Sequence, residues 1–342
     1  MAPTVVVAMS GGVDSSVAAA LLKQNGFEVI GAHIVCWDGC ELKEERRDAL
    51  RVALQLNVPL LTFDFRDAYR KAVFDQMIRA YAEGKTPNPD VRCNREIKFG
   101  LFWEKALELG ANYVATGHYA KRVDHGGEPG LWEARDKAKD QSYFLWAVNQ
   151  GRLRRVIFPL QSLTKPEVRQ IARGLKLSTA AKKDSQGLCF VGPVHFDDFL
   201  REYIPCRQGV VVDSNGKILG AHDGVAFYTV GQRHGLGLGA QAPYYVAEKN
   251  VATNTLIVGV GPEDPILFKN EVSVGQLNWL SDFRSGRCET RIRYRQSKVP
   301  AQVTAGDDKA RVIFESPQRG VAAGQSAVFY DAERVLGGGV IL

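Results

Sequence analysis

A glycine-rich loop near the start of the chain constrains the fold more than any other feature. The hexad SGGVDS at residues 10–15 follows the apolar run of residues 5–9, and helix-forming residues continue to Leu22. A β-branched run is typical of a buried parallel strand, so the loop joins a strand to a helix N-terminus. Glycines let a phosphate approach the backbone, and the N–H groups and the helix dipole attract its charge. The pattern predicts a phosphate or pyrophosphate site, with an ordinary serine-capped junction as the alternative.

Strand and helix patterns alternate through the first 120 residues. We expect strands at 5–8, 28–35, 59–63 and 113–116, and helices at 15–24, 44–56, 68–83 and 97–109. Such alternation predicts a doubly wound parallel sheet. Ligands of these sheets bind beyond the carboxyl ends of the strands, so residues 10–15, 33–37 and 117–118 should share one edge.

The pattern changes twice further along the chain. Residues 140–173 read as helical, with a helix start at Thr164-Lys165-Pro166-Glu167. After about residue 205 the sequence becomes rich in glycine and short β-patterned segments, and residues 272–341 are β-patterned to the end. We therefore expect an α/β catalytic domain at 1–203, a small β-rich central domain at 204–265 and a C-terminal β-barrel at 266–342.

The composition is that of a globular protein, and the sequence shows no membrane signal. Apolar residues make up 45% of the chain, and no run approaches the roughly 18 apolar residues that a spanning helix needs. Residues 1–4 lead directly into the first strand and leave no room for a secretory or transit peptide. We expect a cytoplasmic protein without membrane contact, in which the six cysteines are mostly reduced.

Clusters of basic side chains say more about partners than the net charge of +6 does. Arg291, Arg293 and Arg295 alternate along a β-patterned segment, which predicts three guanidinium groups on one face of a strand. Such a face suits a phosphate backbone. A solvated barrel edge protected by charge is the alternative.

Two cysteines stand out by the residues around them. Cys93 lies in a proline-punctuated loop just before a helix, beside Arg92 and Arg95, and positive charge at a helix N-terminus favours the thiolate. Cys189 lies beside Lys183 and a glycine turn. The alternative for each is a buried small apolar residue, although the charged flanks argue against burial in an apolar core.

Several blocks that occur in order resemble one known family. They are SGGVDS at 10–15, NPD at 88–90, CN at 93–94, ATGHY at 115–119, KDQSYFL at 139–145, KDS at 183–185, CF at 189–190, GQR at 231–233, GLG at 235–237 and LGGG at 336–339. The chain resembles the tRNA-specific 2-thiouridylases essentially from end to end. These ATP pyrophosphatases make 2-thiouridine at the wobble position of certain tRNAs.

The resemblance implies a mechanism. ATP, with Mg²⁺, adenylates the oxygen on carbon 2 of the wobble uracil at position 34 in the anticodon stem-loop. A persulfide on Cys189, loaded by a sulfur-relay partner, then delivers sulfur, while Cys93 frees the sulfur or forms a disulfide with Cys189. Which cysteine performs which step stays open. Asp90 is the candidate general acid or base, with a simple turn residue as the alternative.

The resemblance also implies two sets of site residues. Those that hold ATP are Ala8, Met9, Ser10, Gly11, Gly12, Val13, Asp14, Ser15, Ile34 and Gly117, with Asp14 as a Mg²⁺ ligand or a loop-ordering carboxylate. Those that meet the target base or the tRNA are Asn88, Pro89, Asp90, His118, Lys139, Asp140, Gln141, Arg293, Tyr294 and Gln325. Ile34-Val35-Cys36-Trp37 replaces the family's Met-Lys-Asn-Trp, which alters the adenine side.

Other functions remain in competition at this point. An amidotransferase of the GMP synthetase type would adenylate a carbonyl without needing a cysteine pair. A tRNA-binding protein without catalysis would not need the intact loop and both cysteines. Cys93, Cys189 and Cys36 could hold an iron–sulfur cluster if folding brought them together. Zinc is disfavoured, because Cys36 and Cys40 have no second pair at metal-ligand spacing.

Overall fold

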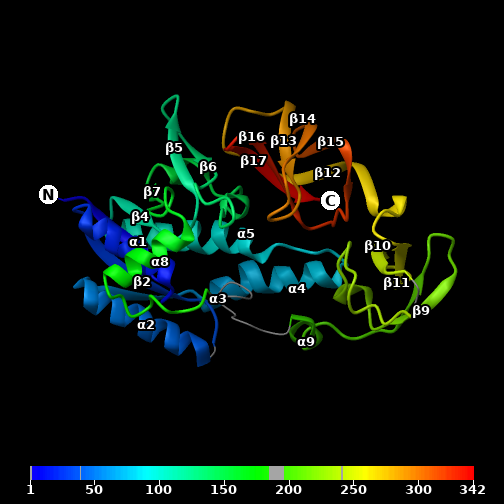
Figure 1. Cartoon of the computed structure of the whole chain (residues 1–342), viewed down its shortest axis with the longest axis horizontal. Helices are drawn as coiled ribbons and strands as arrows, with labels where there is room; N and C mark the ends of the chain where they lie inside the picture. Colours follow the sequence, from blue (N-terminus) through cyan, green and yellow to red (C-terminus); the bar gives the residue numbers. More distant parts are fainter. Residues whose placement is uncertain (1, 39, 185–195, 240–241) are drawn as a thin grey trace.

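A parallel sheet forms the first part of the computed structural model, which describes residues 2–38, 40–184, 196–239 and 242–342 (Figure 1). Within these residues its strands run in the order β3-β2-β1-β4-β7, and every neighbouring pair is parallel. The strands are β1 (Thr4–Ala8), β2 (Glu28–Val35), β3 (Leu60–Asp64), β4 (Tyr113–Ala115) and β7 (Val156–Ile157). The predicted doubly wound parallel sheet is confirmed.

Helices cover both faces of the sheet because alternate residues of β1 point to opposite sides. Val5 and Val7 pack in one hydrophobic cluster and Val6 in another, and all three are fully buried. The first cluster includes residues of α1 (Val13–Gln24), α2 (Cys40–Leu56) and α8 (Lys165–Gly174). The second includes two long helical segments, at residues 66–82 and 89–108.

Each long helical segment contains a π-helical stretch. The first consists of α3 (Arg66–Tyr69), η1 (Arg70–Phe74) and α4 (Asp75–Ala82), and the second of α5 (Pro89–Cys93), η2 (Asn94–Leu101) and α6 (Phe102–Glu108). The second begins earlier than the predicted residue 97, because the Asn88 side chain accepts from the Val91 N–H at 3.3 Å and Pro89 occupies the first turn. The prediction that Cys93 lies in a loop before a helix is therefore wrong: it lies at the end of α5.

The predicted helical character of residues 140–173 is also wrong in part. Before α8 this stretch holds only two short helices, η3 (Ser142–Phe144) and α7 (Gln150–Leu153), and strand β7 lies between α7 and α8. Val156 and Ile157 pair with Val114 and Ala115 at the edge of the parallel sheet. A strand of two residues leaves no periodicity in the sequence, so the tertiary pairing decides its conformation.

A small β-rich unit follows the parallel sheet. In the described residues its strands have the order β10-β11-β8-β9. The elements are α9 (Phe196–Arg201), β8 (Gly209–Val212), β9 (Ile218–His222), η4 (Val225–Phe227), β10 (Tyr244–Asn250), β11 (Thr255–Val260) and η5 (Pro265–Leu267). Aromatic rings fix this unit to the first helical segment, since the rings of Phe199 and Tyr203 lie 5.9 and 4.9 Å from that of Phe74.

The last strands close into a barrel, as predicted. Within residues 268–341 the order β12-β15-β14-β13-β16-β17 is closed by pairing of β12 with β17. The strands are β12 (Phe268–Trp279), β13 (Gly286–Arg291), β14 (Val299–Ala305), β15 (Lys309–Arg319), β16 (Ser326–Asp331) and β17 (Arg334–Ile341). None of the helices in the described parts of the chain combines the length and the apolar character needed to cross a membrane.

The sequence did not reveal how the barrel joins the rest of the protein. A hairpin from the first half of the chain, β5 (Lys121–His125) and β6 (Glu128–Trp132), extends the barrel sheet, because β6 pairs with β17. The glycines at 337–339 let the barrel wall approach closely: a Cβ on Gly338 would lie 3.0 Å from the indole of Trp146. The Trp146 indole N–H donates to the Ser326 hydroxyl at 2.9 Å, in a fully buried contact.

Ser326→Ala tests how much this hydrogen bond contributes to the free energy of unfolding. The Trp146 indole N–H would then be buried without an acceptor, which costs about 1–3 kcal/mol. We expect the free energy of unfolding to fall by that amount in a urea titration followed by tryptophan fluorescence. Ser297→Ala, an exposed serine of the same barrel, should change it by less than about 0.5 kcal/mol. Equal stability of the two variants would contradict the assignment.

Candidate active site

The SGGVDS loop is folded around its own hydroxyl groups. The Ser10 backbone N–H donates to the Ser15 hydroxyl at 3.2 Å, the two hydroxyls lie 3.2 Å apart, and the Gly12 N–H donates to Ser10 Oγ at 3.3 Å. Gly12 is the N-cap of α1 and has no side chain with which to occupy the first N–H groups of the helix. These groups are therefore placed to receive an anion.

Two glycines bring neighbouring elements against this loop. Gly11 has φ +76°, and a Cβ there would lie 2.2 Å from the carbonyl oxygen of Glu45 in α2. Gly117 follows β4, and a Cβ there would lie 2.7 Å from the Ser15 backbone nitrogen. On the other side, the buried His33 ring of β2 lies 3.0 Å from the Met9 carbonyl oxygen. The carboxyl ends of β1, β2 and β4 thus meet at the loop, in the arrangement that we expected from the alternation.

Asp14, in the first turn of α1, contacts a lysine that the sequence analysis did not select. Lys165 Nζ lies 2.8 and 2.7 Å from the two carboxylate oxygens of Asp14, and the Tyr119 hydroxyl donates to Asp14 Oδ1 at 2.9 Å. Burial, together with the charge of Asp14, raises the pKa of the Tyr119 hydroxyl, so it stays a donor. The sequence analysis used Lys165 only as part of a helix start.

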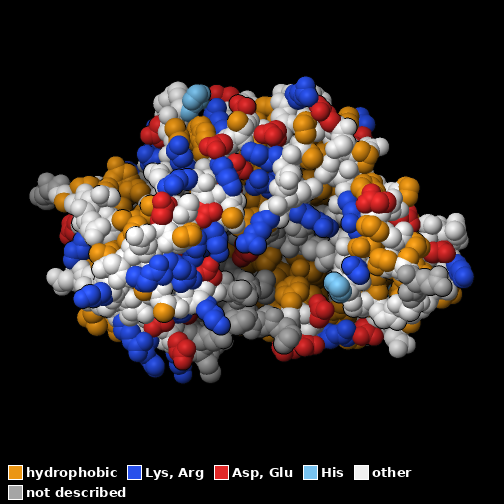
Figure 2. Space-filling view, viewed as in Figure 1, with side chains coloured by type: hydrophobic (Ala, Val, Ile, Leu, Met, Phe, Trp, Pro, Cys, Tyr) orange, Lys and Arg blue, Asp and Glu red, His pale blue; other side chains and the backbone are white. Residues whose placement is uncertain are grey.

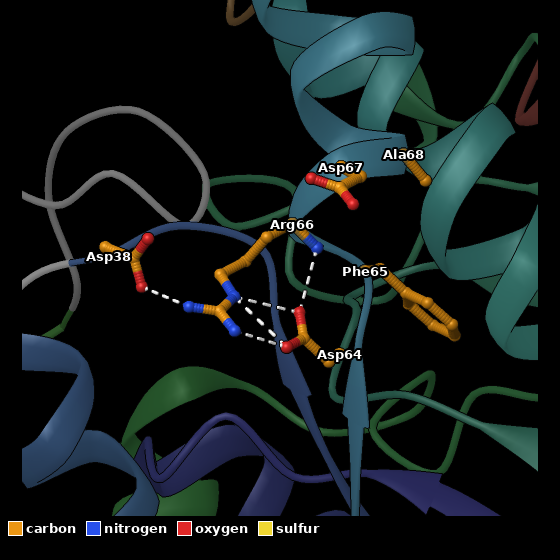
Figure 3. Close-up of a pocket in the computed structure, with 6 residues that line it drawn as sticks. All are labelled: Asp38, Asp64, Phe65, Arg66, Asp67 and Ala68. Atoms are coloured by element: carbon orange, nitrogen blue, oxygen red, sulfur yellow. Dashed lines mark hydrogen bonds and ion pairs between the residues drawn. The ribbon is translucent and has the colours of Figure 1, made fainter.

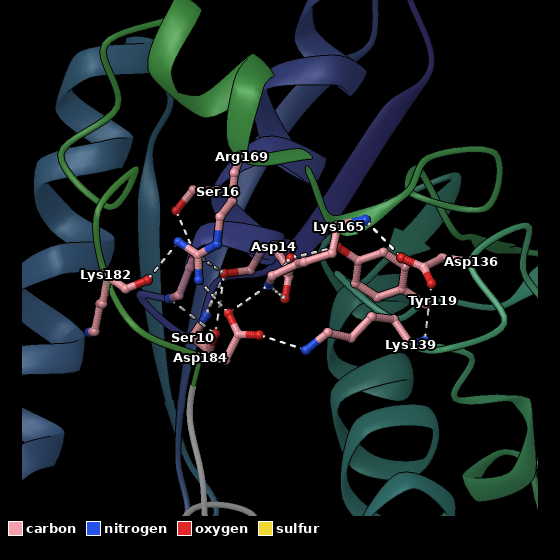
Figure 4. Close-up of polar contacts among 12 residues, drawn as sticks. Ser10, Asp14, Ser16, Tyr119, Asp136, Lys139, Lys165, Arg169, Lys182 and Asp184 are labelled. Carbon is pink, nitrogen blue, oxygen red and sulfur yellow. Dashed lines mark hydrogen bonds and ion pairs between the residues drawn. The ribbon is translucent and has the colours of Figure 1, made fainter. Parts of the chain in front are cut away.

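Basic side chains also converge on Asp184 (Figure 4). Lys139, Lys165 and Arg169 place nitrogens 2.8, 2.8 and 2.6 Å from its carboxylate oxygens. Partial burial opposes ionisation of Asp184, but the hydrogen bonds from Lys139 and Lys165 outweigh it and hold the pKa of this carboxyl well below its ordinary value. The cluster therefore gathers cationic donors beside the phosphate loop, where an anionic ligand needs them.

A cavity of about 390 Å³ opens at the same edge of the sheet, beyond β2 and β3 (Figure 3). Its lining residues are Asp38, Asp64, Phe65, Arg66, Asp67 and Ala68. Arg66 bridges Asp38 and Asp64, with a nitrogen 2.6 Å from each carboxylate. By register Ile34 of β2 lies beside Phe63 of β3, directly before this cavity.

The residues selected for the target base lie at the start of α5. Asn88 caps the helix, while Pro89 and Asp90 are half-buried in its first turn. Cys93 is three residues beyond Asp90 and fully buried in a hydrophobic cluster with Ile97 and Phe102. The argument that charged flanks keep Cys93 out of an apolar core is therefore wrong. The helix start at Pro89 turns Cys93 inward even though Arg92 and Arg95 flank it.

The segment after β4 connects the phosphate loop with this helix. Gly117 touches Ser15, and the ring of His118 lies 5.8 Å from that of Phe99 on η2, the continuation of α5. The His118 ring is buried, and its Nδ1 lies 2.8 Å from the Thr116 hydroxyl. Burial, assisted by the charge of Lys98, lowers the pKa of His118 well below its ordinary value of 6.5, so the ring is neutral.

The KDQ segment uses its polar groups within the protein. Lys139 pairs with Asp184, as described above. Buried Asp140 accepts from the Ala134 N–H at 2.8 Å and from the Ser142 hydroxyl at 2.7 Å, and burial raises the pKa of its carboxyl. Gln141 Oε1 accepts from the Tyr119 N–H at 3.0 Å. Contact of these residues with tRNA stays a prediction.

The prediction that Arg291, Arg293 and Arg295 share one face of a strand is wrong. Strand β13 ends at Arg291, whose guanidinium pairs with buried Glu133 at 3.2 Å, and residues 292–295 form a turn in which Arg295 has φ +63°. Arg293 donates to the carbonyl oxygens of Val230, at 2.7 Å, and Gly320. These guanidinium groups therefore fix protein segments to one another.

The remaining predicted residues fall in two places. The Tyr294 ring packs 4.4 Å from that of Phe144, and the Gln325 side-chain amide donates to the Thr86 carbonyl oxygen at 2.9 Å. Cys189 lies outside the described residues. Figure 2 shows a hollow floored by hydrophobic side chains, with Lys and Arg side chains along its upper rim.

Comparison with known proteins gives matches along the whole chain. Three domain families match in succession: a tRNA methyl transferase HUP domain over residues 3–193, a tRNA methyl transferase PRC-barrel domain over 197–260 and an aminomethyltransferase beta-barrel domain over 269–341. A tRNA-specific 2-thiouridylase MnmA from Legionella pneumophila strain Paris is 44% identical, over 100% of this chain and 99% of its own length. Proteins of the same name from Geobacillus thermodenitrificans and Bacillus subtilis are 44% and 43% identical, each over 98% of this chain and 94% of its own length.

The neutral state of His118 predicts a pH dependence of stability. The unfolded histidine gains a proton near pH 6.5 whereas the buried ring does not, so the unfolded state binds more protons below that pH. The stabilising contribution is complete above pH 6.5 and falls below it by at most about 1.4 kcal/mol per pH unit. We expect His118→Gln to flatten the decline in unfolding free energy between pH 7 and 5. His125→Gln, an exposed histidine, should keep the wild-type slope; equal slopes in all three proteins would contradict the prediction.

Proposed function

The chain belongs to the tRNA-specific 2-thiouridylase family, and we propose that it transfers sulfur to carbon 2 of the wobble uridine of tRNA in an ATP-dependent reaction. One observation carries this proposal: residues 117–118 touch the phosphate loop on one side and the helix of Asp90 and Cys93 on the other. A group that accepts adenylate from ATP at the loop would therefore lie within reach of the α5 side chains.

The loop and the cation cluster fit the triphosphate of ATP. Gly11 and Gly117 stand where a Cβ would collide with backbone atoms, so the backbone is kept close around the loop. Lys139, Lys165 and Arg169 would stabilise the charge that develops on the departing pyrophosphate. Mg²⁺ would enter with ATP and neutralise phosphate charge. Because both Asp14 oxygens already contact Lys165, we assign Asp14 the loop-ordering role.

The chemistry proceeds in two steps under this proposal. The uracil O2 attacks the α-phosphorus, the bond to the β-phosphate breaks and pyrophosphate leaves; Asp90 takes or returns a proton of the uracil ring. The terminal sulfur of a Cys189 persulfide then attacks carbon 2, and the bond from carbon 2 to the adenylate oxygen breaks, releasing AMP. Cys93 thiolate attacks the Cys189 sulfur, which forms a disulfide and leaves the sulfur on the base. Alternatively, Cys93 frees the sulfur before the attack.

The partners follow from this reaction. A sulfur-relay protein would load Cys189, and a cellular thiol or dithiol would reduce the disulfide. Asn88, Pro89 and Asp90 would hold the flipped base. The residues that we propose on the segments facing the anticodon stem-loop are His118, Lys139, Asp140, Gln141, Arg293, Tyr294 and Gln325. A tRNA substrate locates the proposed reaction in the cytoplasm.

We also propose three domains. They are a catalytic domain at 1–203, a central domain at 204–265 and a barrel at 266–342. Hairpin β5–β6 belongs to the first by sequence and pairs with the third.

Cysteine variants test the reaction. We expect wild type to thiolate an unmodified tRNA with a wobble uridine in a single turnover with ATP and a protein persulfide donor. Cys189→Ser should abolish the product, since it removes the persulfide carrier, and Cys93→Ser should reduce it at least 100-fold. Cys206→Ser, an exposed cysteine, is the matched control and should react like wild type. Thiouridine is measured by mass spectrometry of the digested tRNA.

Two results would redirect the assignment. Thiolation by Cys189→Ser at the wild-type rate would remove the persulfide step from the proposal. AMP release by wild type without thiouridine would point to another carbonyl acceptor, as in an amidotransferase of the GMP synthetase type.

Lys165→Met tests the phosphate site separately. Loss of a buried cation beside the phosphate loop should slow tRNA-dependent pyrophosphate release by about 100-fold, on the order found for a missing charge-stabilising donor. Lys105→Met removes an exposed lysine that pairs with Glu108 and should leave the rate unchanged. Wild-type pyrophosphate release by Lys165→Met would exclude Lys165 from the nucleotide site.

A further inference from the structure

A turn of the C-terminal barrel, residues 321–325, holds the backbone just before the candidate base site. The Thr86 N–H donates to the Ala323 carbonyl oxygen at 2.8 Å, and the Gln325 side-chain amide donates to the Thr86 carbonyl oxygen at 2.9 Å. Both backbone groups of buried Thr86 are thus bound by the same turn. A Cβ on Gly324 would lie 2.9 Å from the Thr86 carbonyl carbon, so the approach requires glycine there.

The turn is itself fixed to the barrel. The Gly324 N–H donates to the Ile341 carbonyl oxygen and the Ile341 N–H to the Gln325 carbonyl oxygen, each at 2.8 Å. Val321 and Ala322 are buried within it. The turn therefore leads directly into β16, is hydrogen-bonded to the end of β17 and gives Thr86 a rigid support.

Few soft dihedral angles separate Thr86 from the residues of the base site. Pro87 and Pro89 have φ fixed by their rings, and Asn88 is held by its own cap of α5. A shift of Thr86 is therefore passed on to Asn88 and Asp90. A misplacement of about 1 Å at a reacting group can slow catalysis by about 100-fold.

We propose that Gln325 is a positioning residue for the target base. Its amide nitrogen donates to the Thr86 carbonyl oxygen. Because the two prolines connect Thr86 rigidly to the base site, this hydrogen bond fixes the positions at which Asn88 and Asp90 contact the uracil. Resemblance to the family implies contact of Gln325 with tRNA, whereas the geometry shows that its amide nitrogen donates a hydrogen bond to the protein. This inference rests on the proposed thiolation of tRNA.

Substitutions of Gln325 in the full chain separate the two roles. Gln325→Glu keeps the shape but cannot donate to the Thr86 carbonyl, and Gln325→Ala removes the group. Gln302→Ala, an exposed glutamine of the same barrel, is the control. We expect both Gln325 variants to lower the single-turnover thiolation rate at saturating ATP and tRNA at least tenfold, with the tRNA Kd unchanged within twofold. Deuterium uptake by peptides that cover residues 84–94 should rise in both.

Either of two results overturns the proposal. One is a tRNA Kd weakened at least fivefold with an unchanged rate at saturation, which makes Gln325 an RNA contact. The other is unchanged deuterium uptake at 84–94, which shows that Gln325 does not fix Thr86. If wild type makes no thiouridine, the proposed function fails, and the uptake still decides whether Gln325 holds the loop.

Discussion

The buried ammonium group of Lys165 is the interaction on which the candidate site depends. It stands at the start of α8 and contacts Asp14 of α1 and Asp184 at 2.7–2.8 Å. Such a pair adds little net stability, but removing one partner is destabilising, because the other charge is left unpaired. The pair thereby excludes arrangements in which α1 and α8 slide relative to each other. The phosphate loop leads directly into α1. The contact with Lys165 therefore fixes the position of the loop and places a cation beside it.

The C-terminal barrel supports another part of the candidate site, the segment before α5. Trp146 donates to Ser326 in the barrel, and β6 continues the barrel sheet through its pairing with β17. These contacts join segments that lie far apart in the sequence, and most of them involve backbone or fully buried side chains. Arg293, which donates to carbonyl oxygens of both the central unit and the barrel, extends the connection. The base site therefore depends on segments from the whole chain rather than on the parallel sheet alone.

Features that depend on residues close together in the sequence could be predicted, whereas features that depend on distant residues could not. The hydrophobic run before the SGGVDS loop and the alternation of patterns are local signals, and they predicted the parallel sheet and the edge at which its loops meet. Burial of Cys93 depends on the cap by Asn88, which moves a helix start into what read as a loop. Strand β7 and the contacts of Arg293 are set by distant partners and leave no pattern. Lys165 was visible only as a helix-start residue, because its role requires Asp14, some 150 positions away.

The electrostatics of the cation cluster follow from the same arrangement. Lys139, Lys165 and Arg169 direct their nitrogens at the Asp184 carboxylate. The proposed reaction assigns these same donors to pyrophosphate. A phosphate that binds here must accept hydrogen bonds from donors that now contact the Asp184 carboxylate. Its net binding free energy is therefore the difference between the interaction of these cations with the phosphate and their interaction with the carboxylate. The carboxylate also keeps like charges together that would otherwise repel one another. Because the cations are already gathered, little reorganisation is needed when charge develops on the leaving group, and this is the condition under which electrostatic stabilisation is largest.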